Sequence, residues 1–336
     1  MLAVAATYMG TVVGAGFASG QEVLRFFTCF GERGSWGLML ATPLLVVGGA
    51  GFMELGRRTG ARSYAEALRI LAGSRLGGLL DALTTVFLFT GLAVMAAGSG
   101  ALFHEQLGLP AWVGQAILLM GTLGTVLFGL QGVVAANGVV VPFLISAVML
   151  VTLHEMWRHS SPGWQGWEGG TAAHRFWPVA ALLYASYNLF LSLGVLVPLG
   201  SDLGRRNTLA GGILGGLGLG VTAYAIHLSV LRYLPGAAFL GIPMLLVAAS
   251  LPGWARTAYV LVLFAEVYTT AVANLFALSR RRAWSGGLRL TVPVITAMLL
   301  SQLGFARLVM TFYPLAGWVG LWLLLSLPRA LLRRRP

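Results

Sequence analysis

The chain has 336 residues, of which 57% are hydrophobic and only 10% are charged, and its formal net charge at pH 7 is +12. A soluble protein carries about 25% charged residues, so this composition excludes a soluble globular protein and predicts an all-α integral membrane protein in contact with the lipid bilayer. The positive charge does not indicate a nucleic-acid partner, because the basic residues form short clusters between apolar runs, as orientation signals do in membrane proteins.

Ten stretches of the chain are apolar enough to cross a membrane as helices, each of which needs about 20 residues. Most arginines fall in loops on the same side as the N-terminus, so both termini are predicted to be cytoplasmic. The amphipathic stretch Ser63–Leu71 is predicted as an interfacial helix, and 236–250 as an outer hairpin or interfacial helix. The predicted spans lie near residues 2–29, 35–56, 80–104, 111–130, 132–156, 176–200, 208–232, 254–279, 289–305 and 309–328.

The longest outer loop, 157–175, divides these spans into five and five. Because each half has an odd number of helices, the halves enter the membrane from opposite sides, which is the requirement for an inverted repeat. We therefore expect a first five-helix repeat at 1–156 and a second at 176–330, together forming a single transmembrane domain. This expectation rests on parity and span length alone.

The first span contains TVVGAGFASGQEVLRFF, with Gly14, Gly16 and Gly20 close together. Glycine lowers helix propensity, so we expect the helix to unwind near residues 14–18. Ser19 and Glu22 match the S-x-x-E capping box, which predicts that a new helix starts there. Unwound carbonyls can bind a cation and the new helix N-terminus an anion, so a binding site is predicted near the middle of the membrane.

Close helix packing is the alternative explanation for these glycines. We prefer it for the glycine-rich stretch 211–220, whereas the polar residues of 19–22 favour a break in the first span. A dinucleotide-binding loop is excluded, because the glycine spacing does not fit and no strand precedes it.

The stretch GAGFASGQE at 14–22 resembles the signature of the YkvI-type family of bacterial membrane proteins, related to the amino acid–polyamine–organocation superfamily. The resemblance implies a LeuT-type fold: two inverted five-helix repeats, with the first and sixth spans broken at a central substrate site. It also implies an ion-coupled carrier of amino acids or other small solutes, located in the bacterial inner membrane.

By this resemblance the sixth span should also break, near Tyr184, Ser186, Tyr187 and Asn188. Hydroxyl and amide side chains can satisfy freed backbone groups and contact a polar solute. Ordinary hydrogen bonding between helices explains the same residues, and both interpretations stay open.

The eighth span contains two adjacent threonines, Thr269 and Thr270. The resemblance implies that their hydroxyls face the carbonyls of Val12 and Val13 and hold Na⁺, a hard cation that prefers oxygen ligands. Threonine in a membrane helix also often bonds to the carbonyl one turn earlier, which is the alternative.

Two carboxylates, Glu22 and Glu266, lie within predicted spans, where ionisable groups are functional candidates. A role in H⁺ coupling is therefore the alternative to Na⁺. Glu22 lies one turn before Arg25, which could neutralise it. A negative charge near the site would favour a zwitterion or a cation over an anion. The lone His227 is interpreted as a packing residue.

Together these features predict a symporter of a small polar solute, an amino acid or a related zwitterion or amine, that works by alternating access. A membrane sensor that binds a ligand without transport is the alternative. An enzyme is not expected: there is no nucleophile elbow or P-loop, and His154 and His159 are wrongly spaced for zinc. No cofactor beyond Na⁺ or H⁺ is expected, and no oligomeric state is indicated. The predicted substrate-binding residues are Gly14, Ala15, Gly16, Phe17, Ser19, Gly20, Glu22, Tyr184, Ser186, Tyr187 and Asn188.

Overall fold

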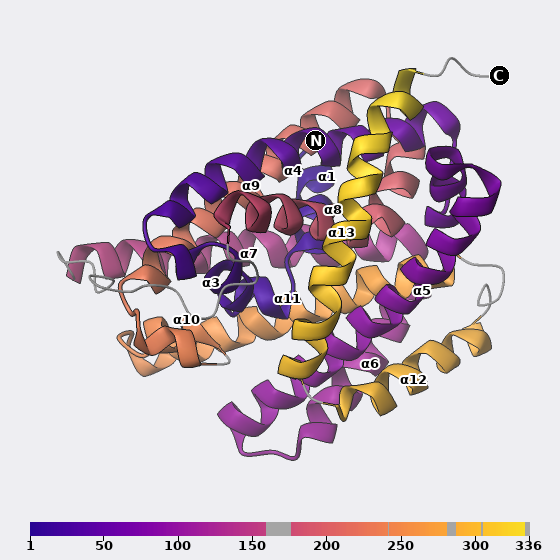
Figure 1. Ribbon diagram of the computed structural model, residues 1–336. Coiled ribbons are helices and arrows are strands. Elements are labelled where there is room, and N and C mark those ends of the chain that lie inside the picture. The colour runs from indigo at the N-terminus through magenta and orange to yellow at the C-terminus, as the bar shows by residue number, and fades with distance from the viewer. Residues whose placement is uncertain (159–175, 241, 281–286, 304, 333–336) are drawn as a thin grey trace.

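The computed structural model describes residues 1–158, 176–240, 242–280, 287–303 and 305–332, which form helices joined by short connections (Figure 1). The helices before the outer loop are α1 (Leu2–Val12), α2 (Ala15–Ala18), α3 (Gln21–Phe26), η1 (Thr28–Phe30), α4 (Arg33–Thr59), α5 (Tyr64–Leu107), α6 (Ala111–Val126) and α7 (Gly129–Arg158). Those after it are α8 (Trp177–Ser201), α9 (Arg205–Leu231), η2 (Gly236–Phe239), α10 (Pro243–Ala248), α11 (Gly253–Ser279), η4 (Gly287–Leu290), α12 (Thr291–Ser301) and α13 (Phe305–Leu332).

Seven helices in the described part of the chain are long and apolar enough to cross a membrane: α4, α5, α7, α8, α9, α11 and the C-terminal part of α13. Three shorter apolar helices, α1, α6 and α12, lie in other predicted spans. The stretch 236–250 forms η2 and α10, which are too short to span. The outer loop between the two predicted repeats lies mostly outside the described residues.

The helical segment predicted at Ser63–Leu71 is the first part of α5. Gly73 has a non-helical backbone with φ +78°, which separates this segment from the long apolar part of the helix. Ser63 caps it by accepting a hydrogen bond from the Glu66 amide at 3.3 Å. The Glu66 carboxylate in turn accepts from the amide of Arg62 at 2.8 Å. This reciprocal arrangement resembles a capping box, displaced by one residue.

The glycine-rich stretch 211–220 allows α9 to pack closely against α4 and α1, as predicted for it. A Cβ atom at Gly212 would lie 2.5 Å from the Cα of Ala50, and one at Gly216 would lie 2.6 Å from the Cα of Val46. Because these neighbours are backbone atoms, they cannot move aside as a side chain does. The packing interpretation of this stretch is confirmed.

Helices α4 and α8 pack even more tightly, through two glycines near their C-terminal ends. A Cβ at Gly56 would overlap the carbonyl oxygen of Val197, and one at Gly200 would overlap that of Met53. Helix α8 is the most completely buried of the long apolar helices, and in Figure 1 it lies behind α13. The centre of the protein is therefore built around α8.

The predicted break in the sixth span is wrong, because α8 is one uninterrupted helix from Trp177 to Ser201. Its polar side chains bond to carbonyls within the same helix. Ser186 donates to the Leu182 carbonyl at 2.6 Å, and Asn188 donates to the Tyr184 carbonyl at 3.0 Å. No glycine interrupts the helix before Gly194, so these side chains supplement an intact hydrogen-bond ladder.

We predict that Gly200→Ala lowers the free energy of unfolding by about 1–3 kcal/mol, the range for overpacking a tight core. The added methyl group has to push apart two backbones, so the apparent Tm in detergent should fall by several degrees. The matched control is Gly138→Ala, at an exposed helical position where a Cβ meets nothing within 4 Å. An equal effect of the two substitutions would contradict the proposed α4–α8 contact.

Candidate functional site

The first span consists of three helical pieces in the structure. Helix α1 ends at Val12, and Val13 has an extended backbone with φ −70° and ψ 123°. The single turn of α2 follows, so residues 15–18 are helical where the sequence predicted an unwound segment; Gly20, with φ +80°, lies between α2 and α3. Glycine is needed at position 20 because other residues rarely adopt this left-handed conformation.

The carbonyls that these interruptions leave without helical partners are bound by groups from distant parts of the chain. The Val13 carbonyl accepts from the Thr270 hydroxyl. The Ala18 carbonyl accepts from the Tyr259 hydroxyl at 2.9 Å, and that of Ser19 accepts from the amide of Met244 at 2.9 Å. Helices α10 and α11 therefore hold the interrupted segment in place.

The predicted capping box of Ser19 and Glu22 is wrong. The Ser19 hydroxyl accepts from the Gln21 amide at 3.3 Å and donates to the Gly16 carbonyl at 3.1 Å. Gly20, not Ser19, occupies the N-cap position of α3. Its left-handed backbone changes the direction of the chain, so the Glu22 carboxylate does not return to Ser19.

The Glu22 carboxylate instead lies in the protein interior, where it accepts a hydrogen bond from the Tyr187 hydroxyl of α8. Its residue is only 3% exposed. A Cβ at Gly16 would overlap the Glu22 Oε1 atom and lie 2.7 Å from its Cγ, so glycine at position 16 makes room for the carboxylate. The predicted neutralisation by Arg25 is wrong: among the described residues no ion pair joins the two. The guanidinium belongs to a partly exposed residue, whereas the carboxylate is directed inward.

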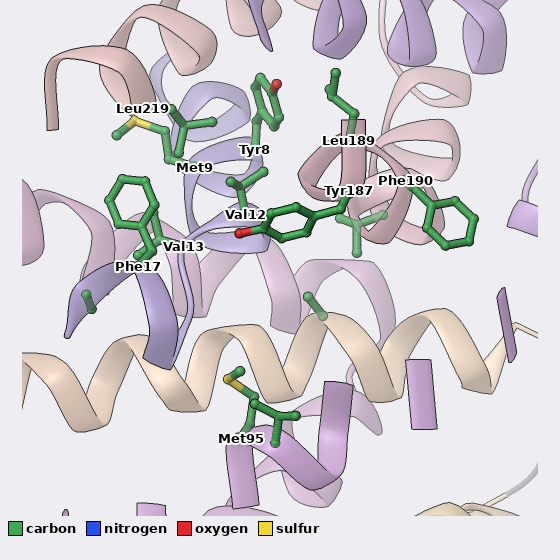
Figure 2. Close-up of a cluster of buried hydrophobic side chains, with 14 of the residues drawn as sticks. Tyr8, Met9, Val12, Val13, Phe17, Met95, Tyr187, Leu189, Phe190 and Leu219 are labelled. Atoms are coloured by element: carbon green, nitrogen blue, oxygen red, sulfur yellow. The ribbon is translucent and has the colours of Figure 1, made fainter. Parts of the chain in front are cut away.

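A small cavity lies where α1, α3, α5, α8 and α11 meet. Its volume is about 20 Å³, which is room for a single water molecule. Figure 2 shows Tyr187 with its hydroxyl directed toward the end of α1, where Val12 lies. The lining residues are Thr11, Val12, Gly14, Glu22, Gly91, Met95, Tyr187, Asn188, Leu191, Thr270 and Asn274.

Several of the predicted site residues line this cavity and others do not. Those that line it are Val12, Gly14, Glu22, Tyr187, Asn188 and Thr270, and those outside its lining are Val13, Ala15, Gly16, Phe17, Ser19, Gly20, Tyr184, Ser186, Thr269 and Glu266. The sequence reasoning missed Thr11, Gly91, Met95, Leu191 and Asn274. For Asn274 a signal existed, because it lies one helical turn after Thr270 and thus on the same face.

Four aromatic rings pack together beside the cavity. The ring centroids of Phe27 and Tyr184 are 4.8 Å apart, and Phe26 lies 5.6 Å from Tyr184 and 5.5 Å from Tyr187. Tyr184 and Tyr187 meet edge to face at 5.7 Å. These rings connect the end of α3 to α8, so they fix the position of the Tyr187 hydroxyl that binds Glu22.

The two threonines of the eighth span have different surroundings. Thr270 reaches the first span, whereas the Thr269 hydroxyl donates to the Glu266 carbonyl of its own helix at 3.1 Å. Glu266 is fully buried, and within the described residues neither of its carboxyl oxygens has a hydrogen-bond partner. Of the two threonine hydroxyls, that of Thr270 bonds to the first span and that of Thr269 does not. Glu266 lies one helical turn before Thr270 on α11.

The oxygen atoms of Val13 and Thr270 are the kind of ligand that hard cations prefer. A site for a transition metal would instead need a cluster of His, Cys, Asp or Glu side chains. No group of three such side chains lies together in the part of the chain that the structure describes.

The chain was compared with known proteins and structures. No family model matches it. It is similar in fold to a Na⁺-coupled sialic acid symporter (TM-score 0.65, 13% identity, 95% of this chain and 75% of that one). It is also similar to MhsT in complex with L-phenylalanine (TM-score 0.67, 16% identity, 98% and 87%). A third similar structure is Mhp1, a nucleobase-cation-symport-1 family transporter (TM-score 0.64, 15% identity, 94% and 74%).

Two proteins of Bacillus subtilis (strain 168) are similar in sequence. YyaD is 25% identical over 326 residues, which cover 95% of this chain and 93% of YyaD. The membrane protein YkvI is 34% identical over 326 residues, which cover 94% of this chain and 91% of YkvI. With this identity over nearly the whole of both sequences, and with a fold similar to that of LeuT-type transporters, the chain belongs to the YkvI family of membrane proteins.

Proposed function

We propose that this protein is an ion-coupled secondary transporter of a small polar solute, an amino acid or a related zwitterion or amine. The observation that carries the proposal is the cavity at the interruption of the first span, where a buried carboxylate faces amide and hydroxyl groups. Irregular backbone inside a membrane is tolerated beside a cavity or protein, and in transporters it forms the binding site. Similarity in fold to solute symporters supports the same function.

The topology that accompanies this function has ten spans in two inverted five-helix repeats, residues 1–156 and 176–330. The seven long apolar helices lie in seven of the ten predicted spans, and the shorter helices α1, α6 and α12 lie in the other three. Both termini are cytoplasmic in this arrangement, and the membrane is the bacterial inner membrane. The arginine distribution supports the orientation.

Sodium is the coupling ion in this proposal, bound beside the interruption by the Val13 carbonyl and the Thr270 hydroxyl, with Val12 adjacent in the chain. The hydrogen bond between these two oxygens supports the site, because it brings a hydroxyl and a carbonyl oxygen together; Na⁺ binding requires this bond to break so that both oxygens face the ion. Substrate then binds in the neighbouring cavity, which has to enlarge from about 20 Å³ to hold a solute. The binding of Na⁺ and the binding of solute are coupled when both stabilise the same closed conformation of the transporter.

The proposed function is tested by reconstituting the purified chain in liposomes with a sodium gradient. Labelled solutes that stabilise the protein in detergent should accumulate inside, and collapse of the gradient should release them. Liposomes without protein are the control. A ligand that binds to the reconstituted protein but does not cross the membrane would overturn the transporter proposal in favour of a sensor.

Thr270→Ala should abolish the dependence of uptake on sodium, because it removes the only side-chain oxygen of the described residues that bonds to the Val13 carbonyl. Thr270→Ser keeps the hydroxyl and should retain at least part of that dependence. Thr269→Ala is the matched control and should keep the sodium dependence, since the Thr269 hydroxyl bonds within its own helix. Sodium-dependent uptake by Thr270→Ala at the level of the unmodified protein would contradict the sodium site.

Gly16→Ala should weaken substrate binding by about tenfold or more, a loss of about 1.4 kcal/mol, because the new methyl group displaces the Glu22 carboxylate. Binding affinity is measured together with the apparent Tm, so that misfolding is recognised. If Gly16 acts through Glu22, then Gly16→Ala should add little further loss to Glu22→Gln in a double-mutant cycle. Fully additive losses would refute this role for Gly16.

A further inference from the structure

The charge of the cavity narrows the class of solute that it can hold. Glu22 is the only side chain with a formal charge among the described residues that line it. The other polar lining groups are the hydroxyls of Thr11, Tyr187 and Thr270 and the amides of Asn188 and Asn274. The described lining therefore has one carboxylate and contains no arginine or histidine to balance its charge.

Among the described residues the Glu22 carboxylate also has no positively charged partner. Within the described residues Glu22 takes part in no ion pair, and the hydrogen bond that it accepts comes from a neutral phenol, Tyr187. Burial of a charge is costly unless it is paired. A positively charged solute can pair with the carboxylate. The free energy of this pairing is most favourable where the protein itself provides no positive partner.

A second feature of the cavity also favours a cation. Tyr187 lines the cavity, and its ring belongs to an aromatic cluster with Phe26, Phe27 and Tyr184. The negative face of an aromatic ring attracts ammonium groups, and the attraction is larger away from water. An acidic group and an aromatic ring from different helices, α3 and α8, thus border the same space.

A zwitterion fits this space less well than a simple cation. When no Na⁺ is bound, the carboxylate of an amino acid would enter a cavity that already holds the Glu22 carboxylate, with no cationic side chain among the described lining residues to receive it. At Gly16, one of the glycines of the interrupted segment, the Glu22 carboxyl group itself occupies the place that a side chain would take. Two unpaired like charges at close range in a buried site repel strongly.

From these observations, and on the basis of the proposed transport function, we propose that the solute is a small organic cation without a carboxylate, an amine whose ammonium group pairs with Glu22. Glu22 provides the charge, and Tyr187 both orients the carboxylate and provides an aromatic surface. The amides of Asn188 and Asn274 then face the remainder of the solute.

The test uses matched molecules that share a hydrocarbon group and differ in carrying an ammonium group, a carboxylate, both or a hydroxyl, and that are added to the purified chain in detergent at one pH. Isobutylamine, valine, isovalerate and isobutanol form one such series, and 2-phenylethylamine, phenylalanine, 3-phenylpropanoate and 2-phenylethanol form another. Ligand-dependent rises in the apparent Tm give relative affinities. The amine should bind at least about tenfold more tightly than the amino acid or the alcohol of its series.

Variants then assign the preference to the carboxylate. Glu22→Gln keeps the size and the hydrogen bond to Tyr187 but should lose the preference for the amine over the alcohol. Glu22→Asp should retain part of that preference. Glu32→Gln, at an exposed position before α4 that does not line the cavity, removes one negative charge and should leave the preference for the amine unchanged. Each ligand-dependent shift is taken relative to the same variant without ligand, so a change in intrinsic stability does not affect the comparison.

The outcomes separate this inference from the transport proposal. If valine or phenylalanine stabilises the chain and accumulates in liposomes while the amines do not, the transporter stands and the cation inference is overturned. If the amine binds through Glu22 but does not accumulate, the cation site stands and the transport proposal fails. Absence of stabilisation by every amine, or an amine preference that survives in Glu22→Gln, overturns the inference.

Discussion

The structure depends on how the interrupted first span satisfies its backbone inside an apolar environment. Unpaired carbonyls in a bilayer cost several kcal/mol each, so the interruption persists only because Thr270, Tyr259 and the Met244 amide bind the freed oxygens. All three come from the second half of the chain. The interruption is therefore a tertiary feature, and the same contacts that permit it also position the neighbouring cavity.

Glycine serves two different purposes in this protein. In α4, α8 and α9 it brings backbones into direct contact, and there the missing side chain is replaced by main-chain atoms of the neighbouring helix. At position 16 the missing side chain is replaced by the carboxylate of Glu22, and at position 20 glycine permits a left-handed turn. A single residue type thus explains both the close packing of the scaffold and the shape of the site.

The sequence was informative where a property is local and uninformative where it depends on distant partners. Glycine spacing indicated the tight packing of residues 211–220, and apolar length indicated the long helices. The partner of Glu22 could not be read from spacing, because Tyr187 is 165 residues away and a capping box with Ser19 was locally plausible. The interruption expected in the sixth span failed for a similar reason: serine and asparagine fit a continuous helix equally well. Met95 and Leu191 carry no chemical signal, and only the fold brings them to the cavity.

The glycine contacts also imply which parts of the molecule can shift relative to one another. Helix α4 touches both α8 and α9 through main-chain atoms, so these two interfaces leave no room for small adjustments of side chains. Helix α11 instead meets the first span through the flexible side chains of Thr270 and Tyr259, which can exchange partners without backbone rearrangement. In a conformational change, α4, α8 and α9 would therefore move together as one rigid unit. The relative movement would occur where α11 packs against the first span.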